Sequence, residues 1–140
     1  DQLLNVIRRC NILLMNESEA ELLSGQKSLE KAVQLFLDSG PEKVIIKKGS
    51  KGCVLFSDKS VISVGVFPVK NVVDSTGAGD VFGGGYISGL STGLNDKDSL
   101  ILGSALASVC VEDFGVRALL SLKNEELQYR QKFIGDSVSS

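Results

Sequence analysis

The sequence predicts an α/β protein in which helices pack against a largely parallel sheet that carries an antiparallel hairpin. Short apolar runs of strand length alternate with longer segments whose apolar residues recur at helical spacing. Glycine, proline and serine separate these segments. With 140 residues, 43% of them hydrophobic and 23% charged, the chain has the size and composition of one globular domain. Such alternation is typical of layered α/β folds.

The first half of the chain carries most of the strand signals. We expect helices over residues 1–9, 16–25 and 28–38, strands over 11–15, 43–47 and 53–56, and a strand region over 61–69 that Pro68 interrupts or ends. Ser28 is a good N-cap for the third helix, and Gly40-Pro41 stops it. Gly49-Ser-Lys-Gly52 predicts a turn between two strands.

The second half is predicted to be helical. We expect helices over residues 78–91, 97–112 and 122–133, and a frayed tail over 135–140. Asn95 or Asp96 caps the second of these helices, and Gly115 ends it.

Composition excludes several classes of function. A net charge of −2 gives no basic excess for binding nucleic acid or a membrane surface, and no apolar run approaches the roughly 18 residues of a membrane-spanning helix. The absence of histidine excludes Ser-His and Cys-His catalysis and histidine metal sites. Three widely spaced cysteines, Cys10, Cys53 and Cys110, are expected to be reduced residues of a cytoplasmic protein without a signal peptide.

The most informative motif is Asp74-Ser-Thr-Gly-Ala-Gly-Asp80, at the predicted start of a helix. Backbone N–H groups at a helix start point outward, and the helix dipole adds positive potential there, so this segment predicts an anion site. Glycine lets the backbone approach a phosphate closely. Asp80 falls in the first helical turn, where a carboxylate can take a proton from a hydroxyl that attacks a phosphate.

The same motif allows two alternative interpretations, and both stay open. Aspartate is also favoured at an ordinary helix start by the dipole, although Asp74 and the costly run Gly83-Gly84-Gly85 argue for more than that. A dinucleotide site would need an apolar strand directly before the glycines and an acidic residue ending the next strand, and neither is evident. The glycine–lysine pattern of a Walker A loop is absent.

Three ordered motifs resemble the ribokinase-like, or PfkB, family of carbohydrate kinases. Asp74–Asp80, followed by Phe82 and Gly84-Gly85, matches the family's C-terminal signature almost letter for letter. Asn16-Glu-Ser-Glu19 matches its Asn-x-x-Glu motif, and Gly49–Gly52 matches its Gly-x-x-Gly turn. The resemblance covers most of residues 10–117 and implies a Rossmann-like, ribokinase-like sheet flanked by helices.

The resemblance implies an ATP-dependent phosphotransferase that moves the γ-phosphate to a hydroxyl of a sugar, nucleoside or related small molecule. Asp80 would be the general base, and the amides of Gly77, Ala78 and Gly79 would form the anion hole. A further set of residues would bind ATP, Mg²⁺ and a monovalent cation such as K⁺: Asn16, Glu19 (Mg²⁺ through water), Gly49, Gly52, Thr76 and Asp74 (the monovalent cation, with backbone near Gly115).

These implied roles have simpler counterparts. Asn16 and Glu19 also fit a capping box, and Gly49–Gly52 also fits a plain hairpin turn. A module that binds nucleotide without catalysis is a further alternative, which loss of Asp80 or the glycines would have favoured.

Family members are considerably longer than this chain. Their N-terminal part supplies the sugar contacts and a lid through which dimers often form. We therefore expect residues 1–140 to be the C-terminal ATP-binding portion, to lack most of the substrate site, and to turn over little alone. A homodimer of the full-length protein stays open.

Overall fold

The computed structural model describes residues 2–138, which form two compact units divided between Ser63 and Val64. The first unit contains these elements, the last of which ends one residue into the second unit: α1 (Gln2–Ile7), β1 (Ile12–Asn16), α2 (Glu17–Ser24), α3 (Leu29–Ser39), β2 (Lys43–Lys47), the 3₁₀ turn η1 (Gly49–Lys51), β3 (Cys53–Ser57) and β4 (Val61–Val64). The second contains α4 (Ala78–Ser91), α5 (Asp96–Cys110), α6 (Arg117–Leu120) and α7 (Asn124–Asp136). The predicted α/β class is confirmed.

The strands form one sheet in the order β1-β2-β3-β4. β1 and β2 are parallel, with Asn16 level with Lys47 at their carboxyl ends, whereas β2 and β3 are antiparallel. The sheet is therefore mixed rather than largely parallel. The reason is local, because η1 reverses the chain directly after β2, and a parallel pair would have needed a long crossover there.

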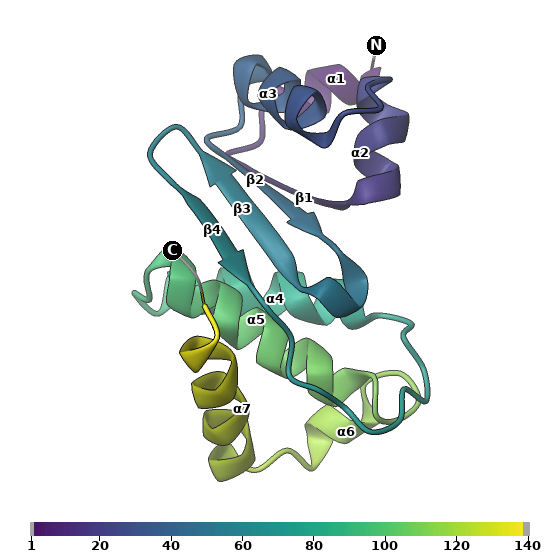
Figure 1. The fold of residues 1–140 in the computed structure, drawn as a ribbon, viewed down its shortest axis with the longest axis vertical. Helices are drawn as coiled ribbons and strands as arrows, with labels where there is room; N and C mark the ends of the chain where they lie inside the picture. Colours follow the sequence, from purple (N-terminus) through teal and green to yellow (C-terminus); the bar gives the residue numbers. More distant parts are fainter. Residues whose placement is uncertain (1, 139–140) are drawn as a thin grey trace. The chain divides into compact units, whose positions relative to one another are not determined.

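The core of the first unit lies between the sheet and helices α1–α3, which gather on one side of β1 and β2 (Figure 1). Alternate β2 side chains, Val44 and Ile46, pack there with Phe36 of α3 and Met15 of β1, and all four are buried. Ser28 caps α3 by accepting a hydrogen bond from the amide of Lys31. The Ser28 cap and the buried apolar face explain why α3 forms as predicted, and the buried alternate side chains explain why β2 does.

In the second unit α4 and α5 lie side by side (Figure 1). A Cβ on Gly85 would come 2.8 Å from Gly103 Cα, and one on Gly103 would come 2.6 Å from the Phe82 carbonyl oxygen. Tyr86 adds a hydrogen bond of 2.7 Å to Asp96 across the same pair of helices. Part of the predicted glycine run therefore has a packing role, whereas Gly84 faces open space.

Several predicted boundaries are corrected. The strand over 61–69 stops at Val64, because the Gly65 carbonyl accepts a hydrogen bond from Ser104 of α5 and Pro68 has no N–H for a ladder. Helix α5 starts after its N-cap Asn95 and ends at Cys110, five residues before Gly115. Helix α6 was not predicted.

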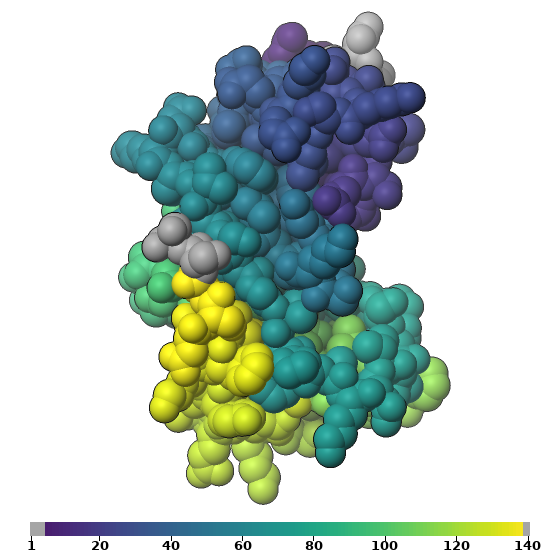
Figure 2. All heavy atoms as spheres, viewed as in Figure 1, coloured from purple at the N-terminus to yellow at the C-terminus, as the bar shows by residue number. Residues whose placement is uncertain are grey.

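Helix α7 also differs from its prediction, since it continues to Asp136 where a frayed tail was expected. Ile134 is fully buried and Gly135 lies against Ile101 of α5, so packing extends the helix. Figure 2 shows the teal atoms of the irregular segment 65–77 against the yellow atoms of α7. Within residues 2–138 no helix combines the length and the apolarity needed to cross a membrane.

The glycines of α4 allow a matched test of this packing. We expect Gly85→Ala to lower the free energy of unfolding by about 1–3 kcal/mol, because its methyl group would press on the Gly103 backbone. Gly84→Ala, one residue earlier and free of contacts, should raise it by roughly 0.5–1 kcal/mol through helix propensity. Urea unfolding measures both, and equal effects would contradict the close helix approach.

Candidate active site

The start of α4 exposes free backbone amides. Gly77 precedes the helix with φ of +80°, a left-handed conformation that favours glycine, and no side chain caps this end. The Ala78 amide donates to the Ser75 carbonyl at 3.2 Å. Among the described residues no acceptor faces the N–H groups of Gly77, Gly79 or Asp80. These amides and the helix dipole make a site for an anion.

Asp80 lies in the first turn of α4, beside these amides. Its side chain is exposed, and within the part of the chain that the structure describes its carboxylate has no hydrogen-bond or ion-pair partner. A carboxylate in this position can accept a proton from a bound hydroxyl without first breaking a protein contact.

Asp74 has a different environment from Asp80 because its two oxygens are both engaged. Its Oδ1 accepts a hydrogen bond from the Thr76 amide at 2.9 Å, and its Oδ2 accepts one from the Gly115 amide at 3.4 Å. Hydrogen bonds from the Thr76 backbone, the Thr76 side chain and the Gly115 backbone lower the pKa of Asp74 below its ordinary value of 3.8. The carboxylate therefore stays charged at neutral pH. It holds the glycine loop, residues 74–80, to the residues that follow α5.

Backbone groups at the end of α5 complete this attachment. The amides of Val73 and Asp74 both donate to the Val111 carbonyl, at 2.8 and 3.4 Å. The Cys110 thiol donates to the Gly115 carbonyl at 3.2 Å, and burial, followed by the charge of Asp74, raises its pKa. Sequence reasoning missed Val111, because a backbone carbonyl carries no residue-type signal.

The other two motifs meet in the first unit. Asn16 ends β1 beside Lys47 at the end of β2, so the loops that follow both strands lie at the same edge of the sheet. Lys48 forms an ion pair of 3.8 Å with Glu17, which links these two loops. In open α/β sheets this edge, at the carboxyl ends of parallel strands, is where ligands bind.

Asn16 and Glu19 form the capping box that their spacing allows. Asn16 Oδ1 accepts from the Glu19 amide at 2.8 Å, and Glu19 Oε2 accepts from the Asn16 amide at 2.7 Å. The Glu19 side chain is nevertheless exposed, and its second oxygen has no partner among the described residues. One free carboxylate oxygen suits a Mg²⁺ that keeps its water and phosphate ligands.

The Gly49–Gly52 turn depends on both of its glycines. Gly49 has φ of +57° and Gly52 has φ of +87°, and the Lys48 amide closes the turn with a bond of 2.7 Å to the Gly52 carbonyl. A Cβ on Gly49 would meet open space, so the chain is accessible there. The turn does join two strands as a hairpin, with β2 before it and β3 after it.

The predicted site residues thus form two groups, one in each unit. Asn16, Glu19, Gly49 and Gly52 share one sheet edge, and Asp74, Thr76 and Gly77–Asp80 share the start of α4. Within the described residues, no three carboxylates or thiols cluster to hold a metal on their own. Burial raises the pKa of the Cys53 thiol to about 12, which keeps it protonated and unreactive at neutral pH.

Comparison with known proteins decides the family. Residues 1–123 match the model of the pfkB family of carbohydrate kinases. The chain belongs to this family. A ribokinase of Haemophilus influenzae is 35% identical over 92% of this chain and 42% of its own length. An adenosine kinase of Saccharomyces cerevisiae is 30% identical over 92% of this chain and 40% of its own.

Solved structures agree with the family assignment. A putative ribokinase II of E. coli, determined with ATP and Mg²⁺, has a TM-score of 0.83 at 30% identity, covering 94% of this chain and 42% of that one. An Arabidopsis thaliana ribokinase with ribose and ATP has a TM-score of 0.82 at 29% identity, covering 93% and 43%. The ribokinase-like fold is confirmed for this PfkB chain, which spans about two fifths of these relatives' lengths.

The dinucleotide alternative lacks its structural context. A dinucleotide fingerprint requires a strand that runs directly into the glycines. In this PfkB chain β4 ends at Val64, and residues 65–77 before the helix are irregular. The glycines therefore lie between an irregular loop and α4, and not between a strand and a helix as a dinucleotide fingerprint requires.

The lowered pKa of Asp74 predicts a pH dependence. The pKa of Asp74 is lower in the folded than in the unfolded protein, so the charged carboxylate stabilises the fold. This stabilisation is complete at pH values above the unfolded-state pKa. It is lost as the pH falls below the unfolded-state pKa and through the folded-state pKa. Wild type should exceed Asp74→Asn in unfolding free energy at neutral pH and lose this advantage only in acid. Urea unfolding of both proteins from about pH 7 to about pH 3 measures this difference. A difference that is constant throughout would contradict it.

Proposed function

We propose that the complete gene product containing this chain transfers the γ-phosphate of ATP to a hydroxyl of a sugar or nucleoside. The observation that carries the proposal is the exposed Asp80 carboxylate beside unbonded amides at the start of α4. The relatives support it, since they are named as ribokinase and adenosine kinase. As members of one family, these kinases share with this chain the region that residues 1–123 represent.

Asp80 would act as general base. It would take the proton of the acceptor hydroxyl while that oxygen attacks the γ-phosphorus and the bond to ADP breaks. The N–H groups of Gly77, Gly79 and Asp80 would face the negative charge that develops on the phosphoryl oxygens, and fixed donors of this kind lower the barrier. If Ala78 joins this anion hole, its amide must first leave the Ser75 carbonyl.

Mg²⁺ and ATP phosphates would be organised from the first unit. Glu19 has one free carboxylate oxygen to contact a hydrated Mg²⁺, which supplies positive charge to the phosphates when bound. Asn16 shapes the turn that presents Glu19, and Gly49 and Gly52 let the backbone approach the nucleotide.

A monovalent cation such as K⁺ would lie near Asp74 and Thr76. The permanent charge of Asp74 and the carbonyls of the loop after α5 are suitable oxygen ligands, although both Asp74 oxygens accept amide hydrogen bonds in this structure. We expect residues 1–140 alone to turn over little, because the kinases they resemble are more than twice as long. Homodimer formation and a cytoplasmic location stay predictions from sequence.

Replacing Asp80 tests the base. Asp80→Asn in the complete gene product should lower kcat about 10²–10⁴-fold, since asparagine cannot accept the proton, while ATP binding measured by calorimetry stays near wild type. Asp58→Asn, an exposed aspartate in the β3–β4 turn, is the matched control and should be silent. Near-wild-type turnover of Asp80→Asn would favour a non-catalytic role for this carboxylate.

Replacing Glu19 separates its capping role from its metal role. Glutamine keeps an oxygen that can accept from the Asn16 amide, so Glu19→Gln should lower the free energy of unfolding only by the lost attraction to the helix dipole, about 0.3–1 kcal/mol. Loss of the charge should raise the Mg²⁺ concentration for half-maximal rate by about tenfold. Glu21→Gln on the same helix is the control. An unchanged Mg²⁺ dependence would remove Glu19 from the metal site.

A further inference from the structure

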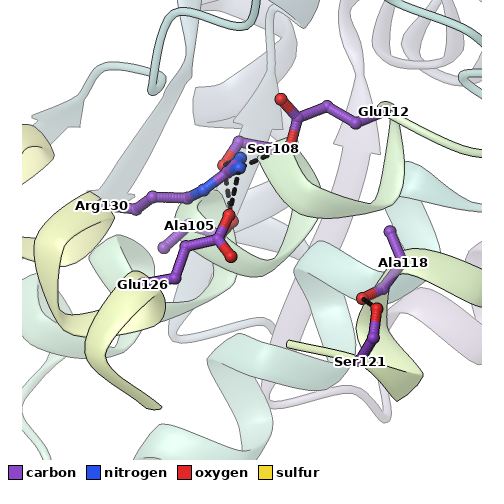
Figure 3. Close-up of polar contacts among 7 residues, drawn as sticks. All are labelled: Ala105, Ser108, Glu112, Ala118, Ser121, Glu126 and Arg130. Atoms are coloured by element: carbon purple, nitrogen blue, oxygen red, sulfur yellow. Dashed lines mark hydrogen bonds and ion pairs between the residues drawn. The ribbon is translucent and has the colours of Figure 1, made fainter. Parts of the chain in front are cut away.

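Arg130 of α7 is a buried charged side chain whose contacts all lie in the second unit. It is only 5% exposed. Figure 3 shows its guanidinium between two helices: Nη1 donates to Ser108 Oγ at 3.0 Å, and Nη2 donates to Glu112 at 2.5 Å and to Glu126 at 2.6 Å. Ser108 belongs to α5, Glu112 follows shortly after it, and Glu126 lies one turn earlier in α7. Arg130 therefore ties α7 to the carboxyl end of α5.

The same guanidinium also contacts the irregular segment 65–77. Its carbon lies 4.7 Å from the centre of the Phe67 ring, a cation–π distance. Tyr129 and Phe133 of α7 meet the Phe67 ring edge-on, with centroids at 5.7 and 5.2 Å. Phe67 is thus held by three side chains of α7, and through Arg130 by α5.

The segment 65–77 leads to the anion site and has no regular structure of its own. Its first residue, Gly65, accepts from Ser104 of α5 at 2.7 Å. Its last part is bonded through Val73 and Asp74 to the Val111 carbonyl, next to Glu112. Both ends of segment 65–77 are therefore hydrogen-bonded to α5 or to the residues just after it. Arg130 contacts this segment at Phe67 and also contacts Glu112, the residue after Val111.

Stability alone does not explain a buried arginine here. The side chains of its partners Glu112 and Glu126 stay 35% and 48% exposed, so water screens both ion pairs, while burial of the guanidinium costs desolvation energy that offsets the attraction. Arg130 also buries its Nε with no hydrogen-bond partner among the described residues. Its planar fork does fix the directions of several groups at once, which an apolar side chain cannot do.

We propose that Arg130 is a positioning residue that holds segment 65–77, and with it Asp74 and the start of α4, in the geometry needed for phosphoryl transfer. It acts through Phe67 and Glu112 and does not touch the reacting atoms. The kinetic part of this inference rests on the proposed function, whereas the structural part does not. Arg130 lies beyond residues 1–123, the part matched by the family model.

Variants of Arg130 test this role in the complete gene product. Arg130→Met keeps much of the side-chain volume but removes the charge and the fork, and Arg130→Lys keeps the charge without the fork. Lys132→Met, which removes an exposed charge from the same helix, is the matched control. Hydrogen exchange of the Val73 and Asp74 amides reports on the segment, and the Leu94 amide, bonded to Gly89 in the α4–α5 connection, serves as internal reference.

We expect exchange at Val73 and Asp74 to rise about tenfold in Arg130→Met, with Leu94 unchanged. At a temperature well below unfolding, kcat should fall about ten- to a hundredfold while KM for the acceptor stays near wild type. For Arg130→Lys, both the exchange rates and kcat should lie between those of wild type and Arg130→Met. Lys132→Met should match wild type in both.

Unchanged exchange at Val73 and Asp74 in Arg130→Met would overturn the positioning role. An equal rise in exchange at Leu94 would also overturn it, because the substitution would then have destabilised the whole unit and not segment 65–77 in particular. If the complete gene product shows no phosphotransfer at all, the proposed function fails while the exchange result still decides on Arg130. Should Arg130→Met not fold, Phe67→Leu removes the stacked ring alone, and wild-type exchange and kcat in that variant would likewise overturn the proposal.

Discussion

Close backbone contact between α4 and α5 is the constraint on which the rest of the second unit depends. Gly85 and Gly103 leave no room for a Cβ on either helix, so the separation of the two axes is set by backbone atoms. Since the free amides at the start of α4 point along its axis, this contact also sets their direction. Tyr86 and Asp96 then tie the two helices together by a hydrogen bond. The direction of the anion site therefore has a packing cause: Gly85 allows the close approach of α4 to α5, whereas Gly77 starts the helix in a left-handed conformation and leaves the amides accessible.

The two aspartates of the glycine loop show how environment assigns different roles to the same residue type. Asp74 accepts two amide hydrogen bonds, has a lowered pKa and anchors the loop to the residues after α5. Asp80, six residues later, is exposed and without a partner among the described residues. An engaged carboxylate is suited to holding structure or a cation, and a free one is suited to accepting a proton. The proposed chemistry follows from this contrast.

Relatives named for different acceptors all match this chain at similar identity. A ribokinase, a cytidine kinase and a 6-phosphofructokinase are 35%, 32% and 35% identical to it over the aligned residues. The similarity is therefore shared by kinases that are named for different acceptors. It is consistent with our proposal that this region holds nucleotide and performs transfer, because those steps are the ones that kinases with different acceptors share.

Local signals determined much of this protein from sequence alone. A short apolar run located β2 and the glycine motif located the start of α4, both to the residue, and the three ordered motifs by themselves indicated the PfkB family. These succeed because strand period, capping and left-handed glycines are short-range properties. Only the tertiary structure decided that Gly85 packs and Gly84 does not, that Val111 holds the glycine loop, and that Arg130 links α7 to segment 65–77. Those contacts join residues distant in sequence, often through backbone atoms, and the spacing of residue types carries no record of them.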